Sequence, residues 1–214
     1  MSRAPSLCAV ILAAGESTRM GSDKALLPWP PAGGGRTASN QTFLSAAIDA
    51  LSPFNDSVIV VVGKNEANLA PLVYATGASL IQNPAPERGQ FSSLQVGLQE
   101  VLNHGRDAAM ITLVDRPPVS TSTLGALVAA FQTALSNEKW GVVPEHGGRH
   151  GHPILAGREM IEAFLRAPAT STARDVTRQN QQHIEYVSID DPMITMNVDT
   201  PEDYAALVEL RVPR

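Results

Sequence analysis

The chain has 214 residues, of which 43% are hydrophobic and 17% charged, and its formal net charge is -5. This length holds one well-buried core and is short for two, so we expect a single domain over residues 1–214 and not a disordered chain. The Lys and Arg residues are scattered along the sequence, which argues against the cationic face that a nucleic-acid partner needs.

Strands and helices are predicted to alternate. LCAVILA (7–13) is the first strand, FLSAAIDAL (43–51) a helix and VIVVVG (58–63) the second strand. Both strands are continuously apolar, as parallel strands are when helices cover both faces. Further strands are predicted at 78–83, 108–115 and 183–188, a glycine-turn hairpin within 140–155, and helices at 92–102, 121–135, 157–166, 171–180 and 201–210. This order predicts an α/β fold with a mainly parallel sheet.

Helix ends and loops carry more specific expectations. Ser120 is predicted to cap the helix at 121–135, and Pro201 is expected at the first position of the last helix. The Pro- and Gly-rich segment 28–40 is expected to be an exposed, mobile loop. The hairpin at 140–155 is expected to cover the functional site as an extra layer.

The N-terminal apolar run has two interpretations. It follows Arg3 and superficially resembles a secretory signal peptide, but it is short and also fits a buried strand, so we expect the chain to remain cytoplasmic. The single cysteine, Cys8, lies in this run and is expected to be a buried thiol, which fits a reducing compartment. No other segment approaches the ~20 apolar residues that span a bilayer, so no membrane partner is expected.

The first strand leads into a turn with two glycines and two cations, LAAGESTRMGSDKALL (12–27). In an open parallel sheet, ligands bind beyond the carboxyl ends of the strands. Gly15 would let backbone N–H groups approach phosphate oxygens, and Arg19 and Lys24 would add positive charge. The pattern indicates a triphosphate site, although it lacks both the G-x-x-x-x-G-K-[ST] and the G-x-G-x-x-G spacing.

This loop resembles the L-A-[AG]-G-x-S-x-R-M-G-x-x-K signature of the molybdenum-cofactor nucleotidyltransferases, which transfer guanylyl or cytidylyl groups to molybdopterin. Four further stretches are similar to motifs of that family and follow in its order: NPAPERGQFSSLQVGL (83–98), LVDRPPV (113–119), GHPIL (151–155) and NVDTPEDYAAL (197–207). The resemblance covers essentially the whole chain. It implies a three-layer α/β/α, Rossmann-like nucleotidyltransferase fold.

The resemblance also implies site residues. Arg19 would lie near the terminal phosphates and Lys24 near the α-phosphate of an NTP, with Asp115 as the third catalytic residue. The base and phosphates would be contacted by Leu12, Ala13, Ala14 and Gly15 and by a second loop with Gly89 and Ser93. Mg²⁺ would be held by Asp115 and by Asp199 or Asn197, with Asp199 favoured. The implied reaction is attack of an acceptor phosphate on the α-phosphorus, with release of pyrophosphate.

Finer features bear on the substrates. The guanylyl branch generally has Gly-Gly where this chain has Ala14-Gly15, which favours CTP over GTP, and the implied acceptor is molybdopterin. Arg116 stands where the cytidylyl branch usually has Gln, and ATSTAR (169–174) replaces the family's Gly-Asp-x-Gly-Ala-Arg stretch. A sugar or polyol phosphate is therefore the alternative acceptor. The alternative from another class is a non-catalytic nucleotide- or cofactor-binding module that serves a molybdoenzyme as its partner.

Three histidines in EHGGRHGH also need an interpretation. His150 and His152 would face one side of a strand, as zinc ligands do, with His146 close by. The competing interpretation is a hairpin with exposed polar residues, which the resemblance favours because the family shows the GHP turn without a zinc role.

Overall fold

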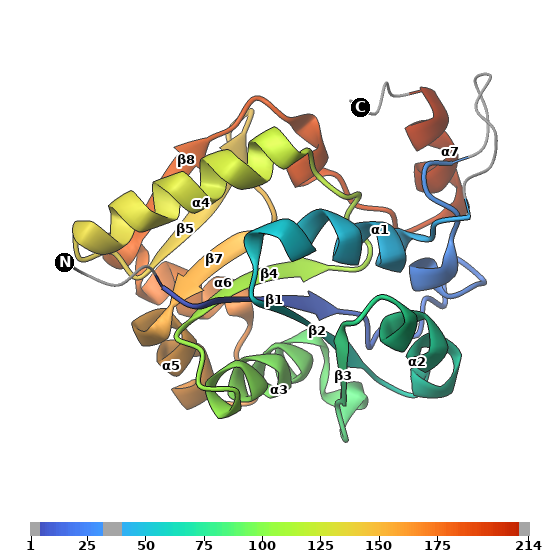
Figure 1. Cartoon of the computed structure of the whole chain (residues 1–214), viewed down its shortest axis with the longest axis horizontal. Coiled ribbons are helices and arrows are strands. Elements are labelled where there is room, and N and C mark those ends of the chain that lie inside the picture. The colour runs from blue at the N-terminus through green and yellow to red at the C-terminus, as the bar shows by residue number, and fades with distance from the viewer. Residues whose placement is uncertain (1–4, 32–39, 210–214) are drawn as a thin grey trace.

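The structure is a computed structural model that describes residues 5–31 and 40–209. The described strands form one eight-stranded sheet in the order β3–β2–β1–β4–β7–β5–β6, and β8 pairs with β5 (Figure 1). The strands are β1 (Leu7–Leu12), β2 (Ser57–Val62), β3 (Ser79–Gln82), β4 (Ala108–Leu113), β5 (Gly141–His146), β6 (Arg149–His150), β7 (Ile154–Gly157) and β8 (Ile184–Ser188). β1 to β4 are parallel, β7 runs antiparallel between β4 and β5, and β5 and β8 are parallel. The sheet is therefore mainly parallel, as predicted.

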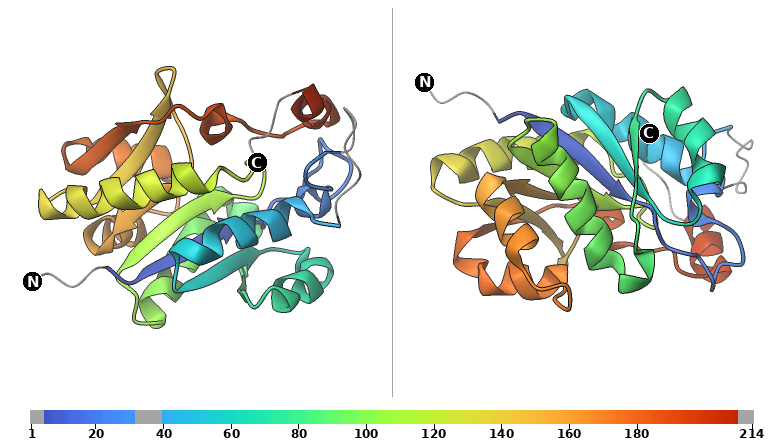
Figure 2. Two further views of the ribbon diagram at one scale, coloured as in Figure 1. Left: turned by 45° about the horizontal axis from the view of Figure 1, so that its top comes forward. Right: turned by 90° about the horizontal axis from the view of Figure 1, so that it is seen from below.

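Helices cover both faces of this sheet. The helices α1 (Phe43–Leu51), α2 (Glu66–Ala75) and α4 (Thr121–Ser136) pack on one face, and α3 (Gln90–Asn103), α5 (Arg158–Arg166) and α6 (Ala173–Gln179) pack on the other. The view from below in Figure 2 brings α3 and α5 to the front of the sheet. The last helix, α7 (Pro201–Glu209), lies beyond one end of the sheet (Figure 1). The predicted three-layer α/β/α architecture is confirmed.

The central strands of the sheet are apolar because each of them faces two cores. All six residues of β1 are buried. Ala9 and Ile11 belong to the core under α1 and α4, whereas Cys8 and Val10 belong to the core under α3 and α5. Successive side chains of a strand point to opposite faces, so a strand with helices on both sides has no polar face. The prediction of a buried Cys8 thiol is confirmed.

Local signals set several helix ends as predicted. The Ser120 hydroxyl accepts a hydrogen bond from Thr123 N at the start of α4, and Pro201 is the first residue of α7. Both arrangements satisfy or avoid the N–H groups that a helix leaves unpaired at its N-terminus. None of the helices in the described ranges is long and apolar enough to cross a membrane.

The structure corrects three expectations. No helix is expected between β2 and β3, yet α2 lies there, with Pro71 inside it and only Leu69 and Val73 buried. The hairpin at 140–155 does not form an extra layer, because its strands belong to the main sheet. The predicted exposed loop at 28–40 contains Trp29, which is 6% exposed and packs edge-on against Phe43 at 4.9 Å. Residues 32–39 of that loop lie outside the described residues.

Candidate active site

A cavity of about 240 Å³ lies at the carboxyl ends of β1 and β4, the parallel strands at the centre of the sheet. Its lining residues are Leu12, Gly15, Ser17, Thr18, Arg19, Lys24, Gln90, Leu113, Val114, Asp115 and Asp199. The four charged residues predicted for the site are all among them, together with Leu12 and Gly15, whereas Ala13, Ala14, Gly89 and Ser93 are not. This edge is where open parallel sheets bind ligands.

The glycine-containing loop after β1 is held in place by Asn65, which precedes α2. Asn65 Nδ2 donates to Ala13 O at 3.0 Å and to Asp23 Oδ2 at 2.8 Å, so one amide joins the two ends of the loop. Gly63 allows the loop to pack closely, because a Cβ atom at that position would lie 2.8 Å from Ala14 O. The sequence analysis missed Asn65 and Gly63, although Gly-Lys-Asn directly after the second strand is a turn signal at the same sheet edge.

Four predicted side chains converge in the cavity from three distant parts of the chain. The Lys24 ammonium lies 2.6 Å from Asp199 Oδ1 and 3.8 Å from Asp115 Oδ2. Arg19 Nη2 lies 3.1 Å from the same Asp199 Oδ1, and the Asn197 amide donates to Asp199 Oδ2. Lys24 is only 9% exposed, whereas the Arg19 side chain is largely exposed. Asp199 is thus the residue of the Asn197–Asp199 pair that contacts both cations.

The two carboxylates have opposite pKa shifts. Burial raises the pKa of Asp115, and the charges of Lys24 and Arg116 offset this only in part. Asp115 Oδ1 is buried and has no hydrogen-bond partner. The hydrogen bond from Lys24 holds the pKa of Asp199 below its usual value. Asp115 Oδ1 is therefore a buried oxygen whose lone pairs are free to bind a cation. Asp199 is ionised at neutral pH.

Asp199 is positioned by backbone hydrogen bonds on both sides of it. Val198 N donates to Asp115 O at 2.9 Å, which fixes the two aspartates side by side. At the start of α7, Asp203 Oδ2 accepts from Asp199 N and from Thr200 N, each at 2.9 Å. This arrangement was not predicted, although Thr200 followed three residues later by Asp203 matches the capping-box pattern.

The second predicted loop is built on Asn83, which is 2% exposed. Asn83 Nδ2 donates to the hydroxyl groups of Ser92 and Ser93, each at 2.9 Å. Gly89 has a φ of 92°, a conformation that L side chains rarely adopt, and it leads directly into α3. Ser93 is buried below the loop, whereas Gln90, which the sequence analysis did not single out, lines the cavity.

A second polar group adjoins Asp115. Arg116 Nη1 donates to Met196 O at 2.8 Å, while its Nε is buried without a partner. Burial lowers the pKa of Arg116. His152 lies near it, with Nδ1 3.4 Å from Ile111 O, and burial together with the Arg116 charge lowers the pKa of His152 to about 4. At neutral pH, His152 is an uncharged imidazole.

The three histidines of the hairpin do not converge. His146 Nδ1 bonds with Ile189 O, His150 stacks on Tyr186 at 4.6 Å, and His152 turns toward Ile111 O. Across the parts of the chain that the structure describes, no group of three His, Cys, Asp or Glu side chains is arranged to hold a metal ion. This geometry favours the hairpin interpretation over a zinc site.

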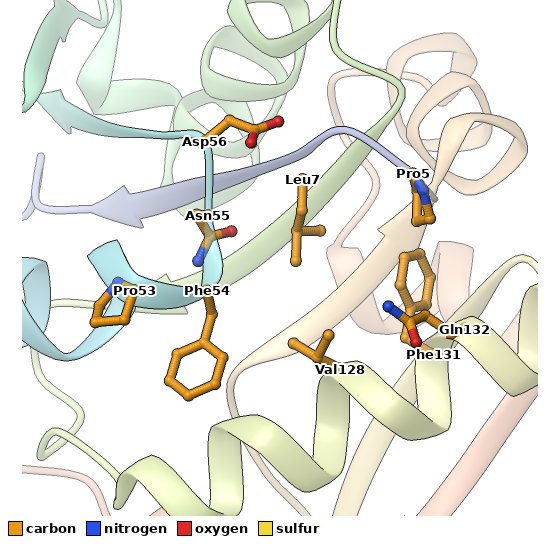
Figure 3. A pocket seen from close by; sticks show the side chains of 9 residues that line it. All are labelled: Pro5, Leu7, Pro53, Phe54, Asn55, Asp56, Val128, Phe131 and Gln132. Atoms are coloured by element: carbon orange, nitrogen blue, oxygen red, sulfur yellow. The ribbon is translucent and has the colours of Figure 1, made fainter. Parts of the chain in front are cut away.

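Another cavity lies at the opposite end of the strands, near the start of β1 (Figure 3). Its lining residues include the apolar Leu7, Phe54, Val128 and Phe131 and the polar Asn55, Asp56 and Gln132. It contains none of the residues predicted for the site. Of the two cavities, the residues predicted to bind phosphate therefore line only the one at the carboxyl ends of β1 and β4.

Residues 9–184 match the family of the MobA-like NTP transferase domain. The chain belongs to this family. Two relatives in the MobA-like group illustrate its range. The chain is 26% identical over 203 residues to the molybdenum cofactor cytidylyltransferase of Escherichia coli (strain K12), covering 94% of each protein. It is 34% identical over 128 residues to the probable molybdenum cofactor guanylyltransferase of Rhodopirellula baltica, an alignment that spans 60% of the chain and 57% of that protein.

Solved structures agree with this assignment at the level of fold. The crystal structure of Rv0371c from Mycobacterium tuberculosis H37Rv has a TM-score of 0.75 at 22% identity, covering 95% of this chain and 98% of that one. The same mycobacterial protein has also been solved in complex with manganese. The predicted family and the predicted Rossmann-like nucleotidyltransferase fold are confirmed. The MobA-like chain is thus a nucleotidyltransferase.

Proposed function

We propose that this chain transfers a nucleotidyl group from an NTP, with CTP preferred, to the phosphate of a molybdopterin-like acceptor in the presence of Mg²⁺. The observation that carries the proposal is the convergence of Arg19, Lys24, Asp115 and Asp199 in one cavity at the carboxyl edge of the sheet. Two cations beside two carboxylates suit a substrate that is a complex of a polyphosphate with a metal ion.

In this proposal the glycine loop binds the nucleotide. The backbone of Leu12, Ala13, Ala14 and Gly15 contacts the base and phosphates, and Gly89 and Ser93 belong to a second base-binding loop. Gly15 supports this role, because nothing lies within 4 Å of the position of a Cβ atom there, which leaves room for a ligand. Ser93 acts from below, since its hydroxyl is engaged with Asn83.

The residues present fit a magnesium ion. Mg²⁺ prefers oxygen ligands and is usually held by one or two carboxylates together with substrate phosphates and water. Asp115 and Asp199 would hold it, and the buried, unpartnered Oδ1 of Asp115 is the observation that supports this fit. Bound there, Mg²⁺ neutralises charge on the phosphates.

In the proposed reaction, no side chain of the protein forms a covalent bond to the substrates. An acceptor phosphate oxygen forms a bond to the α-phosphorus, the bond from that phosphorus to the bridging oxygen breaks, and pyrophosphate leaves with the electron pair. A phosphate monoester loses its second proton with a pKa of about 6, so no protein base is needed at neutral pH. Lys24 stabilises charge that develops at the α-phosphate, and Arg19 orients the leaving pyrophosphate.

CTP is preferred over GTP in this proposal because of Ala14. The resemblance associates Ala14-Gly15 with the cytidylyl branch and Gly-Gly with the guanylyl branch, and one methyl group in a base pocket is worth only about 1–3 kcal/mol of discrimination. The curated relatives include both a cytidylyltransferase and guanylyltransferases, so the base is open to direct test. A cytoplasmic location and a molybdoenzyme that receives the product complete the proposal.

A sugar or polyol phosphate is the second candidate acceptor. ATSTAR (169–174) supports it, because this stretch has no acidic residue where the family has an aspartate. The acidic residue that follows, Asp175, is engaged in a capping box with Thr172 at the start of α6. A structural neighbour named 4-diphosphocytidyl-2C-methyl-D-erythritol synthase, at 14% identity and a TM-score of 0.68, shares the fold. A non-catalytic binding module is the third candidate, and it has less support because its role needs no buried Lys24 beside two carboxylates.

Pyrophosphate release tests these candidates directly. The purified chain is incubated with Mg²⁺ and each NTP, first with molybdopterin and then with sugar and polyol phosphates. We expect release with CTP and molybdopterin, and a loss of rate on the order of 10²–10³ in Lys24→Ala and in Asp115→Asn. Lys64→Ala is the matched control, because it removes an exposed lysine that pairs with Glu16 outside the cavity. Nucleotide binding without release for any acceptor would instead support the binding module.

A further inference from the structure

Arg116 is a cation with spare hydrogen-bonding capacity beside the proposed reaction centre. It directly follows Asp115. Within the described residues, its side chain makes one hydrogen bond, from Nη1 to the backbone oxygen of Met196. Its Nε is buried and unpartnered. A guanidinium carries five N–H donors in a planar fork, so one donor of Nη1 and both donors of Nη2 have no partner in the described residues.

No carboxylate within the described ranges forms an ion pair with Arg116. The two acidic groups near enough to affect it are Asp115 and Asp199, and both lie against Lys24. The neighbouring His152 is uncharged at neutral pH and adds no negative charge. The positive charge of Arg116 is therefore offset by Asp115 and Asp199 only from beyond ion-pair distance.

A second cation adds to this charge. Arg149 of β6 lies close enough for its positive charge to act on Arg116. The β6 strand packs against the 3-10 helix Pro192–Thr195, which leads to the Met196 carbonyl that Arg116 contacts. Arg149 is exposed, and in the described part of the chain its side chain makes no hydrogen bond or ion pair. The two positive charges repel each other, and an anion bound between them would relieve this repulsion.

We propose that Arg116 and Arg149 together bind the phosphate group of the acceptor. This inference rests on the proposed function, because nucleotidyl transfer to a phosphate brings a second anion next to the NTP. Arg19, Lys24 and the glycine loop serve the triphosphate, which leaves the second phosphate without a cation unless another pair supplies it. Guanidinium groups suit that role, since they bind phosphate oxygens with two parallel hydrogen bonds. The position next to Asp115 places the acceptor beside the metal-binding carboxylate.

The proposal assigns the acceptor a chemical class. Arg116 replaces a neutral side chain expected at that position from the resemblance, so this chain selects an acceptor whose phosphate is fully ionised. A phosphate monoester meets that condition at neutral pH, and an uncharged alcohol does not. Arg116 and Arg149 would thus be positioning residues for the acceptor with no part in holding the nucleotide.

Inorganic phosphate is the probe that tests this directly. The full chain is saturated with Mg²⁺ and α,β-methylene-CTP, which cannot release pyrophosphate, and phosphate is titrated in by calorimetry. We expect phosphate to bind beside the nucleotide, and its affinity to fall about tenfold or more in Arg149→Gln and in Arg116→Gln. Nucleotide affinity should be unchanged in both. Arg178→Gln, at an exposed position in α6, is the matched control and should keep full phosphate affinity.

Arg149→Gln is the decisive variant, since the Arg149 side chain makes no hydrogen bond or ion pair within the described residues, whereas Arg116 also holds the Met196 carbonyl. In steady-state turnover, Arg149→Gln should raise the KM for the acceptor and leave the KM for the NTP unchanged, and Arg116→Lys should restore part of what Arg116→Gln loses. Unchanged phosphate affinity in both Gln variants, or phosphate that only displaces the nucleotide, would overturn the inference and leave the proposed function standing. If no nucleotide binds, the proposed function fails. Phosphate is then titrated into the chain alone, and a lower phosphate affinity in Arg149→Gln than in the wild type supports the two-arginine site, whereas equal affinity overturns it.

Discussion

At the scale of single residues, Lys24 occupies the space between the two carboxylates proposed to hold a metal ion. Its ammonium lies 2.6 Å from Asp199 and 3.8 Å from Asp115. A divalent cation bound to these carboxylates repels that ammonium, so metal and Lys24 compete unless phosphate groups draw Lys24 away. The arrangement favours entry of the metal together with the nucleotide, because the triphosphate is an alternative partner for Lys24.

This competition predicts the effect of removing the lysine charge. In Lys24→Gln without nucleotide, Mn²⁺ should bind about tenfold more tightly than in the unaltered chain, as expected for relief of about 1.4 kcal/mol of repulsion. The electron paramagnetic resonance signal of free Mn²⁺ measures this affinity without reference to turnover. Lys64→Gln is the control and should have no effect. Equal or weaker Mn²⁺ binding in Lys24→Gln would show that Lys24 does not share the metal site.

His152 gives a pH-dependent prediction. Its pKa is about 4 in the folded chain against 6.5 for an ordinary imidazole, so between these values the unfolded chain takes up a proton that the folded chain excludes. Stability is therefore fully present above pH 6.5 and falls as the pH drops toward 4, by at most about 3 kcal/mol. Urea denaturation should show that the free energy of unfolding falls less between pH 7 and pH 5 in His152→Gln than in the wild type. His150→Gln, which removes an exposed ring, is the control, and parallel pH curves for wild type and His152→Gln would contradict the prediction.

At the scale of elements, two helical glycines should respond in opposite directions to the same substitution. Gly97 in α3 faces the sheet, where a Cβ atom would lie 2.6 Å from Val10 Cγ1 and 2.8 Å from Val61 Cγ2. Valine side chains in buried strands are stiff and have little room to move. Gly125 in α4 has more space, since its nearest neighbour, Phe54 Cε1, would be 3.8 Å away.

Comparing Gly97→Ala with Gly125→Ala separates the effect of helix propensity on stability from the effect of packing. Alanine favours a helix over glycine by about 1 kcal/mol, so Gly125→Ala should raise the free energy of unfolding by up to that amount. Gly97→Ala gains the same propensity but forces a methyl group into a close-packed contact, which commonly costs 1–3 kcal/mol, so we expect a net loss of about 1 kcal/mol. Urea denaturation of both variants checks the signs. A stabilised Gly97→Ala would mean that α3 can move away from the sheet.

Elements with a strong local pattern were predictable from the sequence. β1 and β2 appeared as unbroken apolar runs because helices cover both their faces, and α1 was predicted with its observed bounds. The helix α2 was not predicted, because Pro71 argues against a helix and the neighbouring sheet, which buries Leu69 and Val73, is not visible in the local sequence. The loop at Trp29 was wrongly expected to be exposed for a similar reason, since its packing partner Phe43 belongs to α1.

The site was predictable where a residue type carries the chemistry by itself. Arg19, Lys24, Asp115 and Asp199 were predicted and do converge, because each lies near the carboxyl end of the sheet. The supporting residues were not predictable in the same way. Asp203 caps its own helix, and its local pattern does not show that it positions a site residue. Asn65 acts by reaching a backbone group of another segment, and that reach depends on the fold. Asn83 has the same character, as its amide supports two buried hydroxyl groups in α3.

At the scale of the whole molecule, the site exists only when distant parts of the chain are folded together. The cavity joins the loop after β1 with the end of β4, and residue 199 is bonded to Lys24 across 175 positions of sequence. Both cores are built from the same central strands, whose opposite faces pack against different helices. Loss of either core removes the sheet edge that carries the site, so folding and nucleotide binding should be linked.

This linkage predicts a single unfolding transition that the nucleotide shifts as a whole. One domain over residues 1–214 should give one calorimetric peak, and CTP with Mg²⁺ at about 100 times its Kd should stabilise the fold by about 2.7 kcal/mol, or roughly 5 to 10 °C in Tm. GTP should give a smaller shift at the same concentration if Ala14 narrows the base site. Asp115→Asn should lose most of the shift, because the Mg²⁺ complex is what binds, while Lys64→Gln should keep it. Two peaks, of which only one moves with CTP, would instead show that the segments forming the cavity belong to a unit that unfolds separately from the rest of the sheet.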